Sequence, residues 1–362
     1  MMSSNTPDDL EPRAPGFLGR LFRIYFVGAL FVAGAAALWY GADVLMLLFA
    51  CILFAILLHA ASAKLRTFVP VSRGAALSIV IVLLLLTLGI GGWLMAPGIS
   101  QQGEELASAI PQAVDKLRSA VGEQPLLRQL AEALPPTEEI VSQVTSVLPN
   151  AGVFFSGLLG VIGNIAIILF AGIYFAAQPR VYIEGIVTLT PPRHRKRARE
   201  VLDELGETLA QWLAGKIVCM LAVGIVSGIG LALLGVPMAA ILGIVAGLLD
   251  FIPYVGPIMA GVPAVLIAFY ESPTTALYVV LLFVAIQTAE GYLLLPLVER
   301  RTVSLPPALN IMMQVLLGTL FGFAGVALAT PLTTIIAVLV TMLYVQNTLH
   351  DPVKTPREAS AQ

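Results

Sequence analysis

The sequence predicts an all-α polytopic membrane protein with about eight transmembrane helices and two hairpin segments broken by glycine and proline. Three observations predict this class: 58% of residues are hydrophobic, 12% are charged, and the mean hydropathy is +0.91. Soluble proteins carry about a quarter charged residues. Too few charges are present to cover an aqueous surface, so lipid must be the main solvent of this chain.

The order of apolar and polar stretches divides the chain into seven segments. We expect a cytoplasmic tail at 1–23, transmembrane helices one to three at 24–97 and an extracytoplasmic insert of amphipathic helices at 98–150. A fourth transmembrane helix is expected at 151–178, followed by a cytoplasmic basic loop with an amphipathic helix at 179–212. The chain then forms a transmembrane core at 213–345 and a cytoplasmic tail at 346–362. The core holds the two broken segments, 237–270 and 305–345. Each is either re-entrant or a pair of short spanning helices.

Lysine and arginine placement predicts the orientation. Basic groups precede the first span and follow the second, the fourth and the span that ends at Arg300. All of them fall on one side if both broken segments enter and leave on the same face, and the positive-inside rule makes that side cytoplasmic. We therefore expect a multi-pass protein of the bacterial inner membrane with both termini cytoplasmic. Residues 1–23 show no cleavable signal, so the first apolar stretch is expected to be a retained signal-anchor.

The two broken segments are the strongest indication of function. Hydrocarbon tolerates a broken helix only where the freed backbone groups are buried in protein or line a wet cavity, and paired breaks point to a transport site. One break runs from Asp250 to Pro257 and leads to Pro263; the other lies near Gly325 and Pro331. In both, proline is expected to open an apolar helix, and we expect the breaks to line one polar pocket. The alternative is two kinked helices packed for shape.

Ionisable and polar residues inside the apolar runs are the next candidates. A carboxylate at a helix centre costs about 2.5–3.5 kcal/mol on insertion scales, so Asp250 and Glu290 should face an interior or a cavity. Gln287 lies one turn before Glu290, and Asn310 and Gln314 form a similar pair. Interhelical hydrogen bonding is the structural alternative for these residues, and a solvated loop carboxylate is the alternative for Asp250.

Glycine pairs at small-xxx-small spacing predict close helix approach. The pairs are Gly224/Gly228, Gly243/Gly247 and Gly318/Gly322. The spacing leaves open whether these contacts lie within the chain or between subunits.

Three consecutive motifs resemble the autoinducer-2 exporter family of bacterial permease-like proteins. They are GVPMAAILGIVAGLLDFIPYVGPIMAGVPAVLIAF with its IPYVGP core, QTAEGYLLLPLVERRTVSLPP with its Gln-x-x-Glu, and GTLFGFAGVALATPLTTII. The resemblance extends over essentially the whole chain. It implies about eight membrane helices, homo-oligomers and transport of small solutes; members are linked to export of the furanone autoinducer-2, and some to sodium/proton antiport. This chain departs from the pattern at Lys216, where the family commonly has glutamine, and at Glu299-Arg300-Arg301 and Leu305-Pro306-Pro307.

These features together predict an integral membrane permease or exporter that moves a small polar solute, autoinducer-2-like molecules included, without ATP hydrolysis. A sodium/proton antiporter and a non-transporting scaffold or channel are the alternatives. No His-Glu-x-x-His, Gly-x-Ser-x-Gly or P-loop occurs in the sequence, so we expect no enzyme activity, catalytic residue, cofactor or metal, and the net charge of −2 does not suggest nucleic acid. The expected partners are the bilayer, the solute or ion, and further copies of the chain. The candidate substrate- or ion-binding residues are Glu290, Gln287, Asp250, Pro253, Tyr254, Gly256, Pro257, Gly325, Pro331, Asn310 and Gln314.

Overall fold

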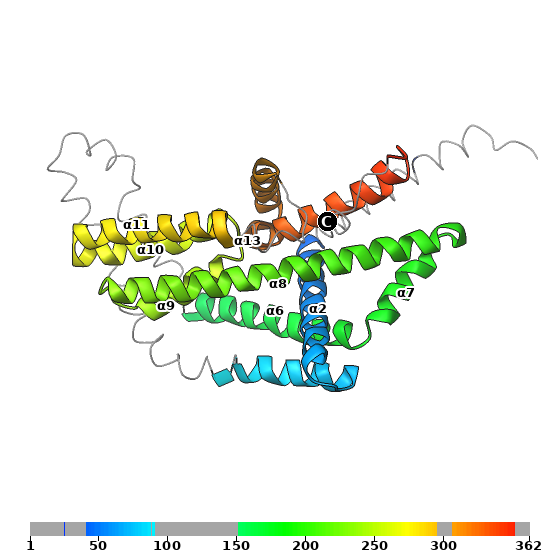
Figure 1. The fold of residues 1–362 in the computed structure, drawn as a ribbon, viewed down its shortest axis with the longest axis horizontal. Helices are drawn as coiled ribbons and strands as arrows, with labels where there is room; N and C mark the ends of the chain where they lie inside the picture. The colour runs from blue at the N-terminus through cyan, green and yellow to red at the C-terminus, as the bar shows by residue number, and fades with distance from the viewer. Residues whose placement is uncertain (1–24, 26–40, 88, 91–150, 295–305, 352–362) are drawn as a thin grey trace, which may run out of the picture. The chain divides into compact units, whose positions relative to one another are not determined.

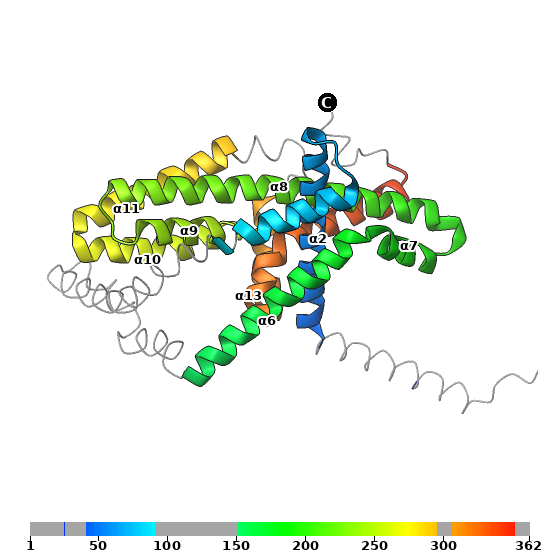
Figure 2. The same ribbon diagram turned by 90° about the horizontal axis from the view of Figure 1, so that it is seen from below.

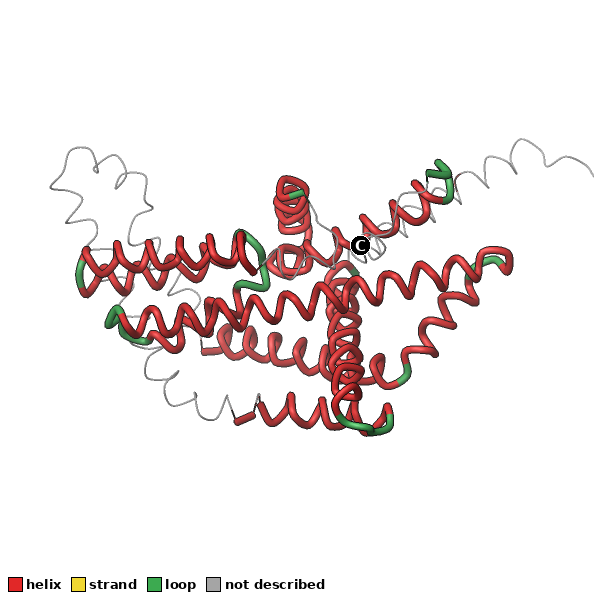
Figure 3. Tube along the Cα trace, in the orientation of Figure 1, coloured by secondary structure: helices red, strands yellow, loops and turns green. Residues whose placement is uncertain are grey.

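A computed structural model describes residues 25, 41–87, 89–90, 151–294 and 306–351 (Figure 1). The secondary structure of this part of the chain is helical, without a strand (Figure 3), which confirms the all-α class. The chain forms two compact units, Met1–Leu45 and Met46–Gln362, and almost all described residues belong to the second. The expected first span and the expected insert at 98–150 lie outside the described residues.

Several of these helices are long and apolar enough to cross a bilayer. Among the described residues, four helices meet this condition: Asp43–Phe68, Pro192–Leu233, Pro273–Leu294 and Pro307–Gln346. A bent pair, Gly163–Ala177 with Pro179–Leu189, makes a fifth if it counts as one span. The chain is therefore a multi-pass membrane protein. The total of about eight spans stays a prediction.

Helices α2 (Ala42–Phe68) and α6 (Ala151–Ala177) pack together. Ala55 and Leu58 of α2 and Ala176 of α6 form one buried cluster, with Leu77 and Leu84 of the helix Arg73–Thr87 against it. After Gln178 the chain bends by 79° into α7 (Pro179–Leu189). Proline is well placed at the first position of a helix because it lacks an N–H that would be unpaired there. The segment expected to begin as a loop at residue 179 is thus helical for its first eleven residues.

Helix α8 (Arg195–Leu233) is one uninterrupted helix of 39 residues, about 58 Å long at 1.5 Å per residue. The boundary expected between residues 212 and 213, between the amphipathic helix and the transmembrane core, therefore falls inside a single helix. The reason is local: residues 209–216 contain no proline, and the lone Gly215 does not break a helix. Where α8 enters lipid stays a prediction.

Glycines let α8 and α9 (Ala239–Leu249) approach to backbone contact (Figures 1 and 2). A Cβ on Gly243 would lie 2.5 Å from the Cα of Gly228, and a Cβ on Gly247 would lie 2.6 Å from the carbonyl oxygen of Met220. The small-xxx-small pairs of these two helices thus act within the chain. On α13 (Pro307–Leu339), a Cβ on Gly318 would meet the side chain of Val326, also within the chain.

The first break lies where the sequence predicts it. Helix α9 ends at Leu249, a turn occupies 250–254, and α10 (Val255–Glu271) begins. Gly256 is required here because a Cβ would collide with the carbonyl oxygen of Leu249. Pro257 lies in the first turn of α10, as expected, but Pro263 lies inside α10 instead of opening a helix.

Helices α10 and α11 (Pro273–Ala289) then form an antiparallel pair. Ser272 caps the N-terminus of α11 by accepting a hydrogen bond from the Thr275 amide. A core of small and β-branched residues fills the space between α8, α9, α10 and α11. The chain continues past α11 into the π-helix η2 (Glu290–Leu294).

The second break is at Gly322, three residues before Gly325, so the prediction of a break near Gly325 is confirmed, whereas the break does not extend to Pro331. Helix α13 (Pro307–Leu339) contains non-helical backbone at Gly322, with φ 59° and ψ −145°, a conformation essentially reserved for glycine. Gly325 packs against the carbonyl of Leu317, where a Cβ would collide. Pro331 lies fully buried inside the returning helix. The π-helix η3 (Val340–Gln346) follows.

Candidate functional site

Three charged side chains from three helices meet inside the protein. Lys216 Nζ donates to Asp250 Oδ2 at 2.9 Å and to Glu290 Oε1 at 3.3 Å. The exposed fractions are 7% for Lys216, 1% for Asp250 and 6% for Glu290. Burial of charged residues to this degree is rare unless they are paired, so this charged cluster is the first candidate for a functional site.

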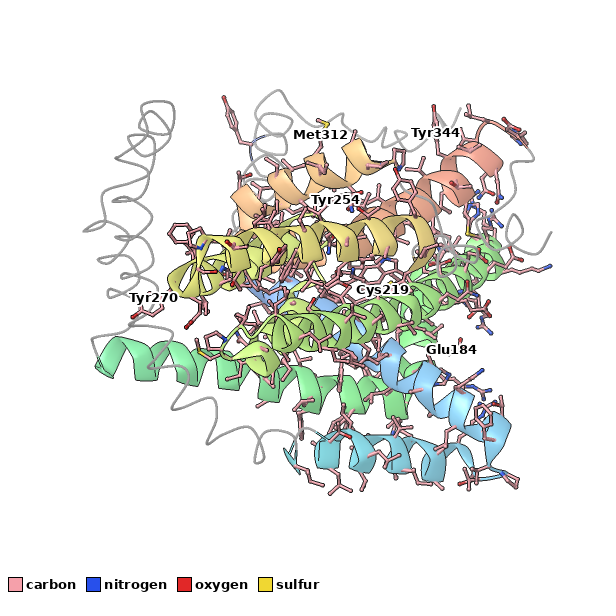
Figure 4. All side chains as sticks on the ribbon, turned by 60° about the vertical axis from the view of Figure 1, so that its left-hand side comes forward. Glu184, Cys219, Tyr254, Tyr270, Met312 and Tyr344 are labelled. Carbon is pink, nitrogen blue, oxygen red and sulfur yellow. The ribbon has the colours of Figure 1, made fainter. Side chains whose placement is uncertain are left out.

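The helices place each member of the cluster for a local reason. Lys216 lies on the buried stripe of α8, between Leu213 and Cys219 (Figure 4 labels Cys219). Asp250 is the C-cap of α9. Glu290 follows the last residue of α11 and begins η2. A helix C-terminus carries partial negative charge, so the end of α9 adds to the field that attracts the ammonium group of Lys216.

The charges of the cluster are not balanced. With both carboxylates ionised, two negative charges face one ammonium group, which leaves a net charge of −1. Asp250 Oδ1 is buried and has no hydrogen-bond donor. Uncompensated buried charge costs several kcal/mol, so a further positive charge at this point would stabilise the cluster.

Two buried polar residues of α13 make different contacts: Gln314 bonds to the turn of the first break, and Asn310 bonds to the part of α13 that follows Gly322. Gln314 is 3% exposed and donates from Nε2 to the carbonyl oxygen of Pro253 at 3.0 Å. Asn310 Oδ1 accepts from Thr330 Oγ1 at 3.1 Å across the two arms of α13. Gln314 therefore connects the second broken segment to the turn that carries Asp250, whereas Asn310 holds its own hairpin together.

The other predicted site residues do not belong to the charged cluster. Tyr254, labelled in Figure 4, has a positive φ of 66° at the turn, and its side chain is 44% exposed. Gln287 is half-buried, and its backbone carbonyl accepts from the Glu290 amide. The sequence predicts that residues 253–257 and 325–331 line one polar pocket. Near these two segments, Phe251 packs against the apolar cluster that contains Leu328 and residues of α2 and α8. The polar pocket between them stays a prediction.

Lys216 is the functional candidate that sequence reasoning missed. From the sequence it stands out only as a departure from the family pattern, but it lies inside the protein. Charge counting gives the missing signal. Between residues 213 and 298, Lys216 is the sole cation, facing the acids Asp250, Glu271 and Glu290. A lone cation in an apolar run with buried acids is expected to pair with them.

A multi-pass helical protein with a charged cluster at a broken helix has the features of a membrane transporter. The comparison with known families agrees. The family model described as the AI-2E family transporter matches residues 29–344, and this chain belongs to that family. The resemblance seen in the motifs is thus confirmed.

Several individual relatives carry names that assign them provisionally to transport proteins or permeases. The chain is 26% identical to PerM of Escherichia coli over 317 residues, 84% of this chain and 89% of PerM. It is 30% identical to YueF of Bacillus subtilis over 203 residues, 55% of each chain, and 28% identical to YrrI of the same organism over 219 residues, 58% of this chain and 62% of YrrI. The chain thus spans only about half to two thirds of the two Bacillus relatives.

Proposed function

We propose that this chain is a gradient-driven transporter that moves a small polar solute across the bacterial inner membrane without ATP hydrolysis. The charged cluster of Lys216, Asp250 and Glu290 carries the proton that drives the movement. The observation that supports the proposal is the charge imbalance of the cluster, together with the buried Asp250 Oδ1 that has no donor. We further propose that both termini are cytoplasmic and that the chain forms homo-oligomers.

The proton cycle follows from the charges. Protonation of one carboxylate neutralises the cluster, and its loss restores a net negative charge inside the membrane. These two states differ in how strongly they hold Lys216, and therefore in how strongly α8 is held to the turn at 250–254. A transporter needs such a difference between two states of one site, each open to one side of the membrane.

A sodium/proton antiporter is the second candidate function. The observation that favours it is the presence of two carboxylates from different helices within reach of one point, because oxygen ligands suit hard cations. Export of autoinducer-2 itself rests on the family resemblance and is a narrower form of the first proposal.

Purified protein in liposomes tests the proposal. A pH-sensitive dye reports proton movement when a sodium gradient or a labelled furanone is applied. We expect a proton flux with the transported compound, and we expect Glu290→Gln to abolish it without changing folding or oligomer size. Glu271→Gln makes the same chemical change at an exposed carboxylate at the end of α10 and should behave like the wild type.

Normal transport by Glu290→Gln across the neutral pH range would contradict the proton cycle. Passive flux without any proton movement would favour a channel. Absence of flux for any applied compound, with the protein folded and inserted, would favour the scaffold alternative.

A further inference from the structure

We infer that Asp250, Glu290 and the C-terminal end of α9 form a site for a monovalent cation, and that the ammonium group of Lys216 occupies it as a tethered cation. This inference deepens the proposed function, because it concerns the same charged cluster. It identifies the class of ion that the site accepts when the lysine is removed. It also implies that the natural protein binds no free sodium ion there, which argues against the sodium/proton antiporter as the second candidate function.

Geometry supports this inference first. The Nζ atom lies between two carboxylate oxygens, at 2.9 Å and 3.3 Å, and these oxygens come from helices other than its own. The acidic partners are separated by 34 and 74 residues from Lys216, so the fold, not local sequence, assembles them. Lys216 reaches the site from α8 and brings one positive charge to a point defined by its neighbours.

Helix ends supply a second, independent observation. Asp250 is the C-cap of α9, so the negative end of the α9 dipole lies at the site. Glu290 begins the π-helix η2, and single π turns inside α-helices occur frequently at functional sites. Broken helices in transporters also use helix C-termini, together with unwound backbone, to hold cations.

Unused ligand capacity is the third observation. An ammonium group donates at most three hydrogen bonds, and two of them go to Asp250 Oδ2 and Glu290 Oε1. Asp250 Oδ1 is buried without a donor, although the residue is 1% exposed. A bare cation coordinates more oxygens than an ammonium group does, and hard cations prefer carboxylate and carbonyl oxygens. The site therefore has an oxygen that a bare cation would use and the lysine does not.

Replacement of the tethered cation tests the inference. Lys216→Gln removes the positive charge and keeps a polar side chain of similar length with an oxygen that can act as a ligand. The two carboxylates then lack a counter-charge, and sodium should enter the site. The double variant Lys216→Gln with Asp250→Asn replaces one of the two carboxylates by a neutral amide with a single oxygen, and it serves as the matched control.

The measurement is binding of radioactive sodium to purified full-length protein in nanodiscs, with thermal unfolding in sodium chloride and in choline chloride alongside. Binding is measured without any transport, so its failure differs from a failure of the proposed function. We expect no saturable binding by the wild type and saturable binding of one sodium ion per chain by Lys216→Gln. In the double variant the affinity for sodium should be lower by about tenfold or more, because loss of a charged ligand has an effect of this size.

Three other outcomes overturn the inference, and one supports it. Sodium binding by the wild type as tight as by Lys216→Gln would show that the lysine does not occupy the site. A folded Lys216→Gln without sodium binding would show that the oxygens do not form a cation site. If this variant folds in sodium chloride but not in choline chloride, the inference is supported; if it folds in neither salt, sodium does not replace the ammonium group and the inference is wrong.

Discussion

Replacing Gly243 by alanine should separate α8 from α9 and destabilise the protein. The added Cβ would lie 2.5 Å from the Cα of Gly228, 2.7 Å from its nitrogen and 2.8 Å from the carbonyl oxygen of Gly224. All three atoms are backbone, so no side chain can rotate away. Ordinary contact begins at 3.4 Å, so the helices must move apart by about 0.9 Å, and overpacking of this kind costs about 1–3 kcal/mol.

Two glycines of the facing helix α8 are matched controls for this prediction. A Cβ on Gly228 has its nearest neighbours at 3.7 Å, which is ordinary contact, and a Cβ on Gly206 has nothing within 4 Å. Gly228→Ala should therefore leave stability nearly unchanged, and Gly206→Ala should raise it by about 0.5–1 kcal/mol, because alanine favours a helix. Unfolding of the purified protein in sodium dodecyl sulfate, followed by circular dichroism, measures all three. The reasoning is refuted if Gly243→Ala is as stable as the wild type or if Gly228→Ala is the more damaging change.

Three further predictions concern other parts of the described chain. Lys216→Met should lower stability by about 3–5 kcal/mol in detergent unfolding, because it leaves two buried carboxylates uncompensated, and adding Asp250→Asn should restore part of the loss. Gly322→Ala should cost about 1–3 kcal/mol in the same assay, because its backbone conformation is strained for alanine. Arg197→Met should speed amide hydrogen exchange in η3, where Arg197 donates to a backbone carbonyl at 2.9 Å; Arg199→Met, which removes an exposed ion pair, should change it little.

Composition and turn residues predicted the class of fold and the first break. The apolar runs are long and nearly uncharged, and such runs have few folding alternatives in lipid. Asp250 and Gly256 bracket a turn whose prolines and glycines act locally, so it could be located from sequence. Asp250 and Glu290 were also selected correctly as buried carboxylates, because their cost in an apolar run does not depend on knowing the fold.

The exact position of the second break, and the pairing of Lys216 with Asp250 and Glu290, depend on tertiary structure. Gly322 and Gly325 lie close together in the same apolar run. Only the folded structure, in which the chain reverses direction here, shows that Gly322 takes the positive φ and that Gly325 contacts Leu317. Pro331 was expected to open a helix but lies inside one, because membrane helices accommodate a proline that would end a soluble helix. Lys216 was missed because its partners lie 34 and 74 residues away, a separation that no local pattern encodes.

The two breaks therefore differ in chemistry. The first places Asp250 at the end of a helix, against Lys216, and so holds charge at a helix junction. The second reverses the chain at a glycine and contributes polar but uncharged side chains. Gln314, on the arm that precedes Gly322, donates to the carbonyl of Pro253, three residues beyond Asp250. A change in the arms of α13 thus acts on the turn that presents the carboxylate, and a change in the charge of the cluster acts on the position of α13 through the same hydrogen bond.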